Sequence, residues 1–416
     1  GIPGVSVAVI NNGVIEWAKG YGMADRAENR KVTAETMFQA GSISKPVAAT
    51  RALQLWEAGL ISLDSNVNNY LSSWKVPDNE FTIKEKVTLR RILDHSAGLT
   101  VWGFPGYPRG DTVSVPSVPE ILNGMGNTDS VLVYKEPGES WRYSGGGYTI
   151  MQLMITDIEQ KTFPEIMQEK VLNPLGMNAS TYLNPLPEKY HSMAATGYHN
   201  DGTEVKGKWH IYPEMAAAGL WTTPSQLVQW ANEIQEIAQK QKDGLLKKET
   251  VKEMLTLSTA DYGLGITVGE HTFGHGGADE GFRALLTGWL EHPIAVVIMG
   301  NSNNGNIIRE IMLSIAKEYD LPGITPQLRT VNEQTPEQLK RFAGKYNFPS
   351  YGTSDLVVKD NGLEFSGEVF SSTVFLLPEN DSTFFNQKTG TYYTFQLEED
   401  AVVGVQFSNV KGEKTE

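Results

Sequence analysis

The sequence predicts an α+β fold, in which an antiparallel sheet flanked by helices is followed by a small all-β barrel. Three observations carry this prediction. Strand-like runs lie near the start of the chain and again at 271–301, with mainly helical segments between them. A polar, Pro- and Thr-containing stretch then follows at 320–336, and after it come only short strand-like runs. Strands at both ends of a helical region are typical of one sheet closed by distant segments.

The first element is a β-hairpin. Residues 5–10 (VSVAVI) and 14–22 (VIEWAKGYG) are rich in β-branched residues and enclose the sequence Asn-Asn-Gly. Asn-Gly favours the tight turns that connect antiparallel strands. We therefore expect two paired strands at the start of the chain.

Most segments in the middle of the chain are expected to be helical, and three of them serve as examples. The first covers 45–58 and ends at Gly59, and the second covers 164–172 and ends at Asn-Pro. The third covers 224–240 and follows Thr223, with proline in its first turn, a combination typical of helix starts.

Three further strands and a helix are expected to complete the first domain. The strands are 271–277, 281–290 and 294–301, and the helix is 306–319. Pairing of these strands with the N-terminal hairpin would close a single sheet.

The C-terminal part changes character. Its short strands are separated by Asn-Gly, Thr-Gly and Pro-Glu-Asn turns, a spacing typical of a small barrel or sandwich. We therefore expect a domain at 1–325, a linker at 326–336 and an all-β domain at 337–416.

Composition excludes several classes of protein. The net charge of −14 and the absence of a basic run argue against a nucleic-acid partner. No apolar run reaches the ~20 residues of a membrane span. The chain has no cysteine, which excludes disulfides and thiolate metal sites. Because it begins at Gly1, we expect that an upstream segment has been removed, and any export signal with it.

No cofactor or metal site is expected. The seven histidines show none of the spacings of catalytic zinc sites. The glycines of 263–269 look like a dinucleotide fingerprint, but no helix and no distant acid follow them.

Ser42 and Lys45 form the first candidate site. Lys45 lies three residues after Ser42, where a predicted helix begins, so both side chains would share one face. Burial would lower the pKa of the lysine and allow it to take the proton of a serine nucleophile. A helix-capping serine beside a solvated lysine is the alternative.

Tyr143 is the second candidate, in the sequence WRYSGGGY at 141–148. The glycines allow close approaches and positive φ angles, and a phenol beside a lysine of lowered pKa can transfer protons. Simple aromatic packing next to a glycine-rich turn is the alternative.

The third candidate is FGHGGADEGF at 273–282. If this strand lies at the sheet edge, His275 projects from it, and Gly277 leaves room for a substrate along the edge. The backbone N–H groups of Ala278 and Ser42 would then form an oxyanion hole. A glycine-rich hairpin with an incidental histidine is the alternative.

In this order and spacing, the three motifs resemble the serine β-lactamase and penicillin-binding protein superfamily, nearest its class C-like and D-aminopeptidase-like members. The resemblance covers roughly residues 1–320 and includes other landmark phrases: IPGVSVAVI, LRRILDHSAGL, PGESWRYS and NPLGM. It implies that Ser42 is the acylated nucleophile, Lys45 its proton acceptor and Tyr143 a second acid/base group. It also implies a β-lactamase/transpeptidase-like fold with the site between helices and sheet, and favours a periplasmic or secreted location.

Two departures from class C β-lactamases bear on the substrate. Gly145 replaces the asparagine of their Tyr-x-Asn motif, and His275 replaces the lysine of their Lys-Thr-Gly motif. A neutral imidazole binds a carboxylate more weakly than an ammonium group does. His-x-Gly instead resembles the D-aminopeptidase, peptidase and esterase branches. Arg283 is expected to be a solvated strand residue, and the alternative is that it restores some anion binding.

The expected function is therefore a serine hydrolase of small D-amino-acid-type peptides or esters, with Ser42 forming the acyl-enzyme. A weak β-lactamase or penicillin-binding protein, and a non-catalytic scaffold that keeps the fold, are the alternatives. Trp102, Phe104 and Tyr107 lie in a loop at 100–116 that is expected to wall the cleft, where they would offer aromatic surface or simply pack locally.

The C-terminal segment resembles the lipocalin-like β domain of several relatives. In those relatives a polar loop of this domain closes over the cleft or mediates assembly. For this chain the resemblance implies the lipocalin-like barrel fold, with a homo-oligomer formed through it as a candidate assembly. On their own, its aromatic residues are expected to pack within strands.

Overall fold

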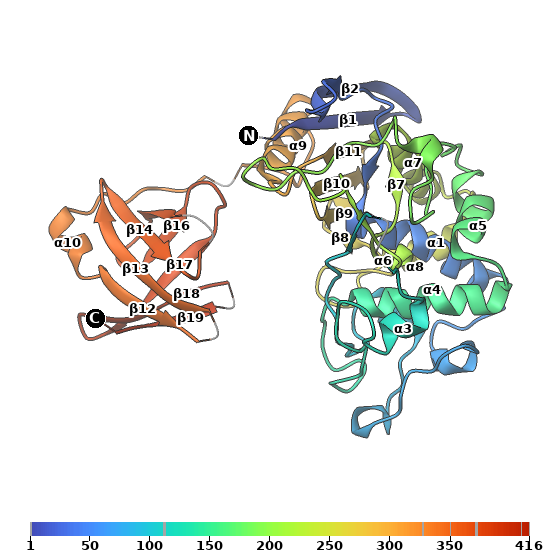
Figure 1. Cartoon of the computed structure of the whole chain (residues 1–416), viewed down its shortest axis with the longest axis horizontal. Coiled ribbons are helices and arrows are strands. Elements are labelled where there is room, and N and C mark those ends of the chain that lie inside the picture. Colours follow the sequence, from blue (N-terminus) through green and yellow to red (C-terminus); the bar gives the residue numbers. More distant parts are fainter. Residues whose placement is uncertain are drawn as a thin grey trace. The chain divides into compact units, whose positions relative to one another are not determined.

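The protein folds into two compact units, residues 1–324 and 325–416 (Figure 1). The structure, a computed structural model, describes residues 2–110, 114–326, 328–349, 351–370, 373–408 and 410–415. The predicted class is confirmed, because the first unit combines helices with one sheet and the second is a closed barrel. The contacts assign Thr325 and the described residues of the predicted linker, 326–336, to the second unit.

A seven-stranded sheet forms the centre of the first unit, in the order β3-β2-β1-β11-β10-β9-β8. Its pairings are all antiparallel, and the N-terminal β1 lies directly beside the late strand β11. The strands are β1 (Gly4–Asn11), β2 (Val14–Asp25), β3 (Arg30–Lys31), β8 (Thr267–Val268), β9 (Thr272–Asp279), β10 (Phe282–Trp289) and β11 (Ile294–Gly300).

The predicted hairpin is present and its turn explains the pairing of β1 with β2. Asn12 and Gly13 both have positive φ, 51° and 78°, as the type I′ connection between twisted strands requires. Both faces of β1 are buried: Val7 and Val9 belong to one apolar cluster, Ala8 and Ile10 to another. Such a strand therefore reads as a continuous apolar run.

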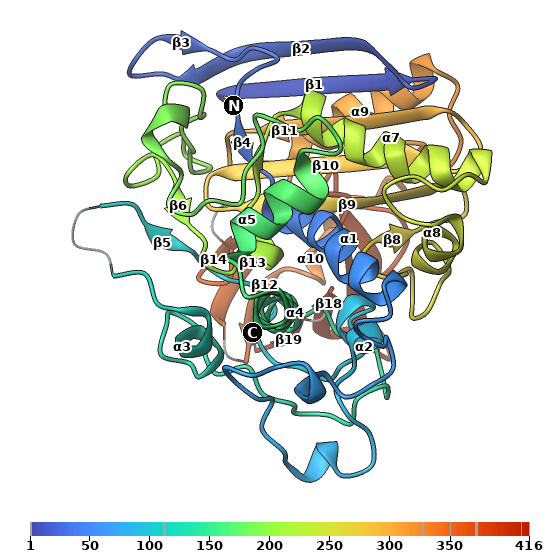
Figure 2. The same ribbon diagram turned by 90° about the vertical axis from the view of Figure 1, so that its right-hand side faces the viewer.

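Helices cover both faces of the sheet. α7 (Pro224–Lys240) crosses β1, β11 and β10 (Figure 2), and its apolar face joins the larger core. α9 (Asn306–Glu318) packs on β10 and β11 from the other side, through the cluster that contains Val7 and Val9. The sheet is thus the middle layer of the unit.

The remaining helices of the first unit form a helical region beside the β9 side of the sheet. They are α1 (Ser44–Glu57), α2 (Leu89–Leu93), α3 (Val118–Leu122), α4 (Gly145–Glu159), α5 (Phe163–Met167), α6 (Met215–Ala218) and α8 (Lys248–Met254). Two short strand pairs, β4 (Phe38–Gln39) with β7 (Trp221–Thr222) and β5 (Tyr107–Pro108) with β6 (His210–Ile211), link the regions.

Two elements differ from the sequence-based expectation. The glycine run at 145–147 forms the first turn of α4, and none of the three has the positive φ expected of a turn. The close approach was correctly anticipated, because a Cβ at Gly146 would lie 2.8 Å from the side chain of Val131. The predicted helix at 164–172 is α5 followed by a π-helical turn at Gln168–Leu172.

The second unit is a closed eight-stranded barrel preceded by α10 (Pro336–Lys340). Buried aromatic rings fill its interior, with Phe342 and Phe395 at the centre of several ring contacts. The strands are β12 (Gly344–Phe348), β13 (Gly352–Lys359), β14 (Gly362–Gly367), β15 (Val374–Pro378), β16 (Thr383–Asn386), β17 (Tyr392–Glu398), β18 (Ala401–Phe407) and β19 (Val410–Lys414).

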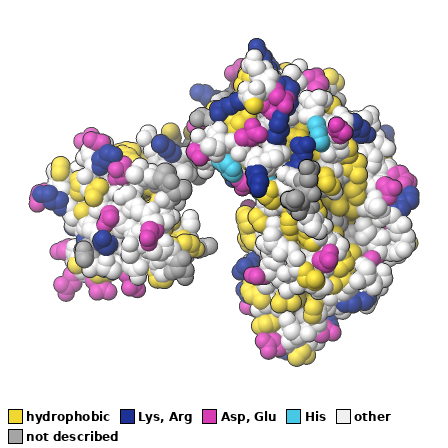
Figure 3. Space-filling view, in the orientation of Figure 1, with side chains coloured by type: hydrophobic (Ala, Val, Ile, Leu, Met, Phe, Trp, Pro, Cys, Tyr) yellow, Lys and Arg dark blue, Asp and Glu magenta, His cyan; other side chains and the backbone are white. Residues whose placement is uncertain are grey.

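The surface carries charges of both signs. Acidic and basic side chains are interspersed on the visible face of each unit (Figure 3), although the chain as a whole has a net charge of −14. Within the described residues, every helix is too short or too polar to cross a bilayer.

Candidate active site

Ser42 lies in a 3-10 turn (Gly41–Ile43) that leads from β4 into α1. This turn packs against β9 so closely that glycines are needed on both sides. A Cβ at Gly277 would overlap the carbonyl oxygen of Ala40, and one at Gly41 would overlap the backbone nitrogen of Ala278. The two glycines therefore bring the backbones of Ser42 and Ala278 to the same cavity wall.

Lys45 lies one helical turn beyond Ser42, on the same face, as the spacing predicts. Its Nζ is 3.0 Å from Ser42 Oγ and donates a hydrogen bond to the carbonyl oxygen of Ala217 at 2.8 Å. The residue is only 2 % exposed. Burial lowers the pKa of Lys45 to about 7, against an opposing effect of Asp279. An amine in this state can accept the proton of the Ser42 hydroxyl.

Tyr143 completes a group of three around Ser42. Its hydroxyl is hydrogen bonded to the Ser42 side chain, and Lys45 Nζ lies 4.9 Å from the centre of its ring. Burial raises the pKa of Tyr143 well above its ordinary value, so the phenol stays protonated at neutral pH. The phenol can therefore donate a proton next to the serine.

His275 lines the same cavity but is held inward by protein contacts. Its Nε2 lies 2.5 Å from the hydroxyl of Tyr262, and its Nδ1 lies 2.5 Å from the carbonyl oxygen of Gly276. Burial, with a smaller effect of Lys45, lowers the pKa of His275 to about 3. The imidazole is therefore neutral at physiological pH, as expected from its place in the motif.

The strand that carries His275 is only partly an edge strand. β8 pairs with β9 only at Phe273 and Gly274. After Gly274, β9 is paired with β10 on one side, and its other side has no strand partner among the described residues. Gly276, Gly277 and Ala278 line the cavity from this open stretch. Backbone groups of β9 are thus available to an extended ligand.

The cavity has a volume of about 640 Å³ and mainly apolar walls. Trp102 is two-thirds exposed at its rim, with its ring 5.5 Å from that of Tyr143. Leu285 and Ile308 provide further apolar surface from β10 and α9. Of the other two expected wall residues, Tyr107 lies in β5, and neither it nor Phe104 lines this cavity.

Two arginines line the cavity as well. The expectation of a solvated Arg283 is wrong, because its guanidinium donates hydrogen bonds to the carbonyl oxygen of Asp279 at 2.9 Å and to Asn303 Oδ1 at 3.2 Å. Arg309 is exposed, and the structure gives it no ion-pair partner among the described residues. A guanidinium without an acid can attract an anionic group of a ligand.

Two buried carboxyls near the site were not found from the sequence. Asp279 accepts a hydrogen bond from the backbone N–H of Gly41, which lets it hold the turn before Ser42. Glu214 immediately precedes α6 and is fully buried, and neither of its oxygens has a hydrogen-bond partner among the described residues. Burial raises the pKa of both groups, that of Glu214 to about 7. Asp279 lies within the stretch 273–282 that carries the third motif, directly after Ala278, but no role was predicted for it from the sequence.

Two family models match the chain, one after the other. A profile of the Beta-lactamase family matches residues 1–317, and a profile of a domain of unknown function, DUF3471, matches residues 328–416. Penicillin-binding protein 4* of Bacillus subtilis is 22 % identical, over 95 % of this chain and 90 % of its own length.

Solved structures show the same fold. The octameric penicillin-binding protein homologue from Pyrococcus abyssi has a TM-score of 0.64 at 22 % identity, over 99 % of this chain and 96 % of its own. The D-amino acid amidase from Ochrobactrum anthropi SV3 has a TM-score of 0.63 at 20 % identity, over 77 % of this chain and 96 % of its own. The predicted resemblance is therefore confirmed, and the chain belongs to the Beta-lactamase family, whose members are typically serine hydrolases.

Proposed function

We propose that the protein is a serine hydrolase that forms an acyl-enzyme on Ser42. The observation that carries the proposal is the contact between a serine hydroxyl and a buried amine, 3.0 Å apart, with a phenol bonded to the same hydroxyl. A serine is a weak nucleophile until a neighbouring base takes its proton. A lysine with a pKa near 7 is such a base at neutral pH.

The proposed reaction has two steps. Ser42 Oγ attacks the substrate carbonyl while Lys45 Nζ takes its proton, and the N–H groups of Ser42 and Ala278 bind the oxyanion. The bond to the leaving group then breaks, and Tyr143 passes a proton to the departing amine or alcohol. Water attacks the acyl-enzyme in the second step, with the same groups returning the proton to Ser42. Lys45 keeps its hydrogen bond to Ala217 throughout, so the lone pair of the neutral amine faces the serine.

We propose amide or ester bonds of small D-amino-acid-type peptides, or esters, as substrates. Trp102, Leu285 and Ile308 favour an apolar side chain or acyl group in the cavity. Arg309 favours a substrate that also carries a carboxylate. The named D-amino acid amidase among the similar structures supports this substrate class by analogy of fold.

A weak β-lactamase or penicillin-binding activity is a second candidate, favoured by the names of the similar proteins. His275 is neutral where class C enzymes have a lysine, which weakens carboxylate binding at that position. We therefore place peptides and esters ahead of β-lactams. A non-catalytic scaffold is the candidate of another class.

The test is to incubate the protein with a fluorophosphonate and, separately, with a penicillin, and to map the adduct by mass spectrometry. We expect one adduct, on Ser42, and its loss in the Ser42→Ala variant. Turnover of p-nitrophenyl esters and D-alanine p-nitroanilide then ranks the substrate classes. An adduct on another residue would overturn the assignment of Ser42, and the absence of any Ser42-dependent product would support the scaffold.

We also propose that copies of the chain associate through the C-terminal unit. The octameric homologue from Pyrococcus abyssi supports this proposal, because its likeness covers 99 % of this chain. Light scattering of the full chain and of residues 1–324 tests it. Equal oligomeric states of the two would contradict it.

A further inference from the structure

His95 is a buried residue at the site that the proposed reaction does not use. It follows α2 and adopts a left-handed backbone conformation with φ of 61°, which a residue with a Cβ adopts only where surrounding contacts hold it. A residue at this position, just after α2, can serve simply to close a turn. The turn is present, but the side chain also reaches Tyr143, 48 positions further along the chain.

His95 binds the peptide groups on both sides of Tyr143. The N–H of Arg142 donates to the carbonyl oxygen of His95 at 2.8 Å. The N–H of Ser144 donates to Nδ1 of the His95 ring at 3.1 Å. One residue thus fixes the backbone before and after the tyrosine.

The ring of His95 also forms one wall for the phenol. Its centre lies 4.2 Å from that of Tyr143, with 33° between the planes. Tyr262 packs edge-on against His95 at 4.8 Å, so the imidazole is itself supported. Trp102 and His275 also pack against Tyr143, at 5.5 Å and 6.2 Å, so the ring of His95 is the nearest of these three.

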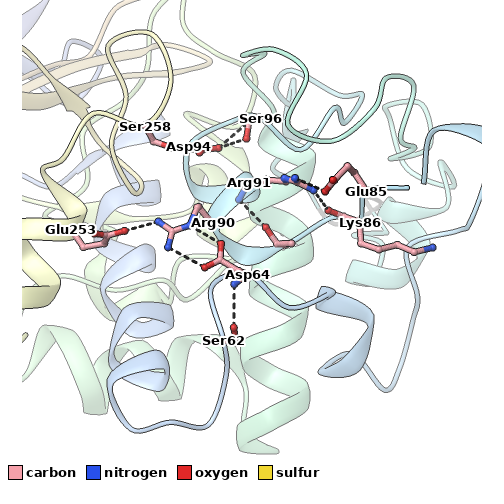
Figure 4. A network of polar contacts seen from close by, with 11 residues as sticks. Ser62, Asp64, Glu85, Lys86, Arg90, Arg91, Asp94, Ser96, Glu253 and Ser258 are labelled. Carbon is pink, nitrogen blue, oxygen red and sulfur yellow. Dashed lines mark hydrogen bonds and ion pairs between the residues drawn. The ribbon is translucent and has the colours of Figure 1, made fainter. Parts of the chain in front are cut away.

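The turn that carries His95 is held by a polar network (Figure 4). Asp94 accepts hydrogen bonds from the N–H and hydroxyl of Ser96 and from the hydroxyl of Ser258. In the same network, Arg90 joins Asp64 to Glu253 across the start of α2. The support therefore comes from three separate segments of the chain.

We propose that His95 is a positioning residue that sets the hydroxyl of Tyr143 for proton transfer at Ser42. The inference rests on the proposed function. Two parts of the ring position Tyr143: its face, which packs against the phenol, and Nδ1, which accepts from Ser144. The third part, Nε2, is buried without a hydrogen-bond partner among the described residues. A leucine or phenylalanine would fill the space without leaving such a donor unpaired.

The hydrogen bond to Ser144 also fixes the charge and tautomer of His95. A backbone N–H can only donate, so Nδ1 accepts and the ring proton sits on Nε2. Burial lowers the pKa of His95 well below its ordinary value, and Lys45 and His275 add to this effect. The other titratable groups that face the ring are Tyr143, Tyr148 and Tyr262.

Two variants separate the two contacts. His95→Asn keeps an acceptor near the position of Nδ1 and tolerates the left-handed backbone, but it removes the ring. His95→Phe keeps a ring and removes the acceptor, which leaves the N–H of Ser144 unpaired. Each is made in the wild-type chain and in the Tyr143→Phe variant, and the rate of Ser42 acylation by a p-nitrophenyl ester is measured in a single turnover.

We expect each His95 variant to slow acylation on the order of tenfold when Tyr143 is present, because small displacements of a catalytic group are costly. In the Tyr143→Phe chain the further loss should stay below about twofold, since the hydroxyl to be positioned is gone. Equal slowing in both chains, or no slowing when Tyr143 is present, would overturn the proposal. His191→Asn is the control, since it removes another histidine ring that is hydrogen bonded to a backbone group, the carbonyl oxygen of Leu186, and that packs edge-on against Trp209.

A second readout does not depend on how the variants fold. In the ¹⁵N spectrum of the wild-type protein, His95 should keep its proton on Nε2 from about pH 5 to about pH 9. A protonated ring near pH 6 would overturn the assignment. If Ser42 itself fails to react, the proposed function is wrong, and this spectrum still reports separately on His95.

Discussion

Lys45 shows how one side chain can be unfavourable for the fold and useful for chemistry. Charged amines are costly to bury, so a lysine at this depth is driven towards its neutral form. A neutral amine can donate a hydrogen bond and accept a proton, and Lys45 has a partner for each: the carbonyl oxygen of Ala217 for the first and the hydroxyl of Ser42 for the second. The pKa of about 7 therefore predicts how the activity depends on pH.

The rate of acylation should rise with pH up to about 7 and level off above it. Lys45 must be neutral to act, so kcat/KM should fall about tenfold for each pH unit below the pKa. Measurement of kcat/KM for a p-nitrophenyl ester across this range checks this fall, the acidic limb of the pH profile. Asp279 is the acidic group that opposes the lowered pKa of Lys45, so Asp279→Asn should move the limb to lower pH. A limb that stays in place would show that Asp279 is already neutral in the protein.

Arg309 should select substrates that carry a carboxylate. Replacement by methionine keeps the length of the side chain and removes the charge, so KM for an acidic substrate should rise about tenfold, the value of one charge-assisted hydrogen bond. The neutral analogue should be unaffected. Lys317→Met is the matched control, because it removes the same charge from the last turn of α9. An equal rise in KM for both substrates would contradict the role.

At this scale the sequence identifies residues within motifs and misses those between them. Ser42, Lys45, Tyr143, His275 and Ala278 were proposed from three short motifs, and the structure brings all five to one site. His95 and Glu214 gave no comparable signal. Their importance lies in contacts with distant segments, which no local pattern encodes.

Among the elements, α6 is a short helix that directly follows a buried carboxyl group, that of Glu214. Its four residues, Met215–Ala218, include the carbonyl group that holds Lys45, and the helix starts from Glu214. Burial raises the pKa of Glu214 from 4.5 to about 7, and Asp279, Tyr107 and Tyr212 are the titratable groups near it. Such a carboxyl group lowers the free energy of unfolding at every pH at which it is ionised in the unfolded chain.

Glu214→Gln should therefore stabilise the protein in a pH-dependent way. A raised folded-state pKa means that wild-type stability is complete below pH 4.5 and is lost as pH rises to about 7. The variant does not titrate, so its advantage should be near zero at pH 4.5 and reach about 1–3 kcal/mol above pH 7. Thermal unfolding at both pH values measures it, with the exposed Glu188→Gln as control. A constant difference between the two pH values would refute the explanation.

Elements with a clear period were predicted well, and those that depend on packing were not. α7 and α9 follow their patterns closely because apolar residues recur at helix spacing, and β1 was recognised as a short apolar run because both of its faces are buried. α4 was missed because three glycines open it, and glycine lowers helix propensity. There the close packing of Gly145 and Gly146 against Phe104 and Val131 outweighs the propensity.

For the whole molecule, the main feature is that the two units have separate cores. The clusters of the first unit end before residue 325, and that of the second begins at Leu339. The change in sequence pattern predicted the architecture of both units. It could not reveal that residues such as Asn332, which donates to the carbonyl oxygen of Pro378, already pack on the barrel.

Residues 1–324 should fold and acylate without the C-terminal unit. This segment retains the hydrogen bond from Trp289 to the carbonyl oxygen of Pro322, so its own core is complete. Calorimetry of the full chain should show two transitions, the smaller with an enthalpy of about 60 kcal/mol for a unit of about 90 residues. A single cooperative transition, or a shortened chain that cannot label Ser42, would show that the units depend on each other.

The closure of the barrel restricts how neighbouring molecules can bind it. β12 pairs with both β13 and β19, so the ring of strands returns to its start. Each of the eight strands then has a neighbour on both sides, so the described residues offer no free edge strand to which another chain could add. Any recognition of this unit must use its side chains, which means that point substitutions on its outside should be enough to abolish it.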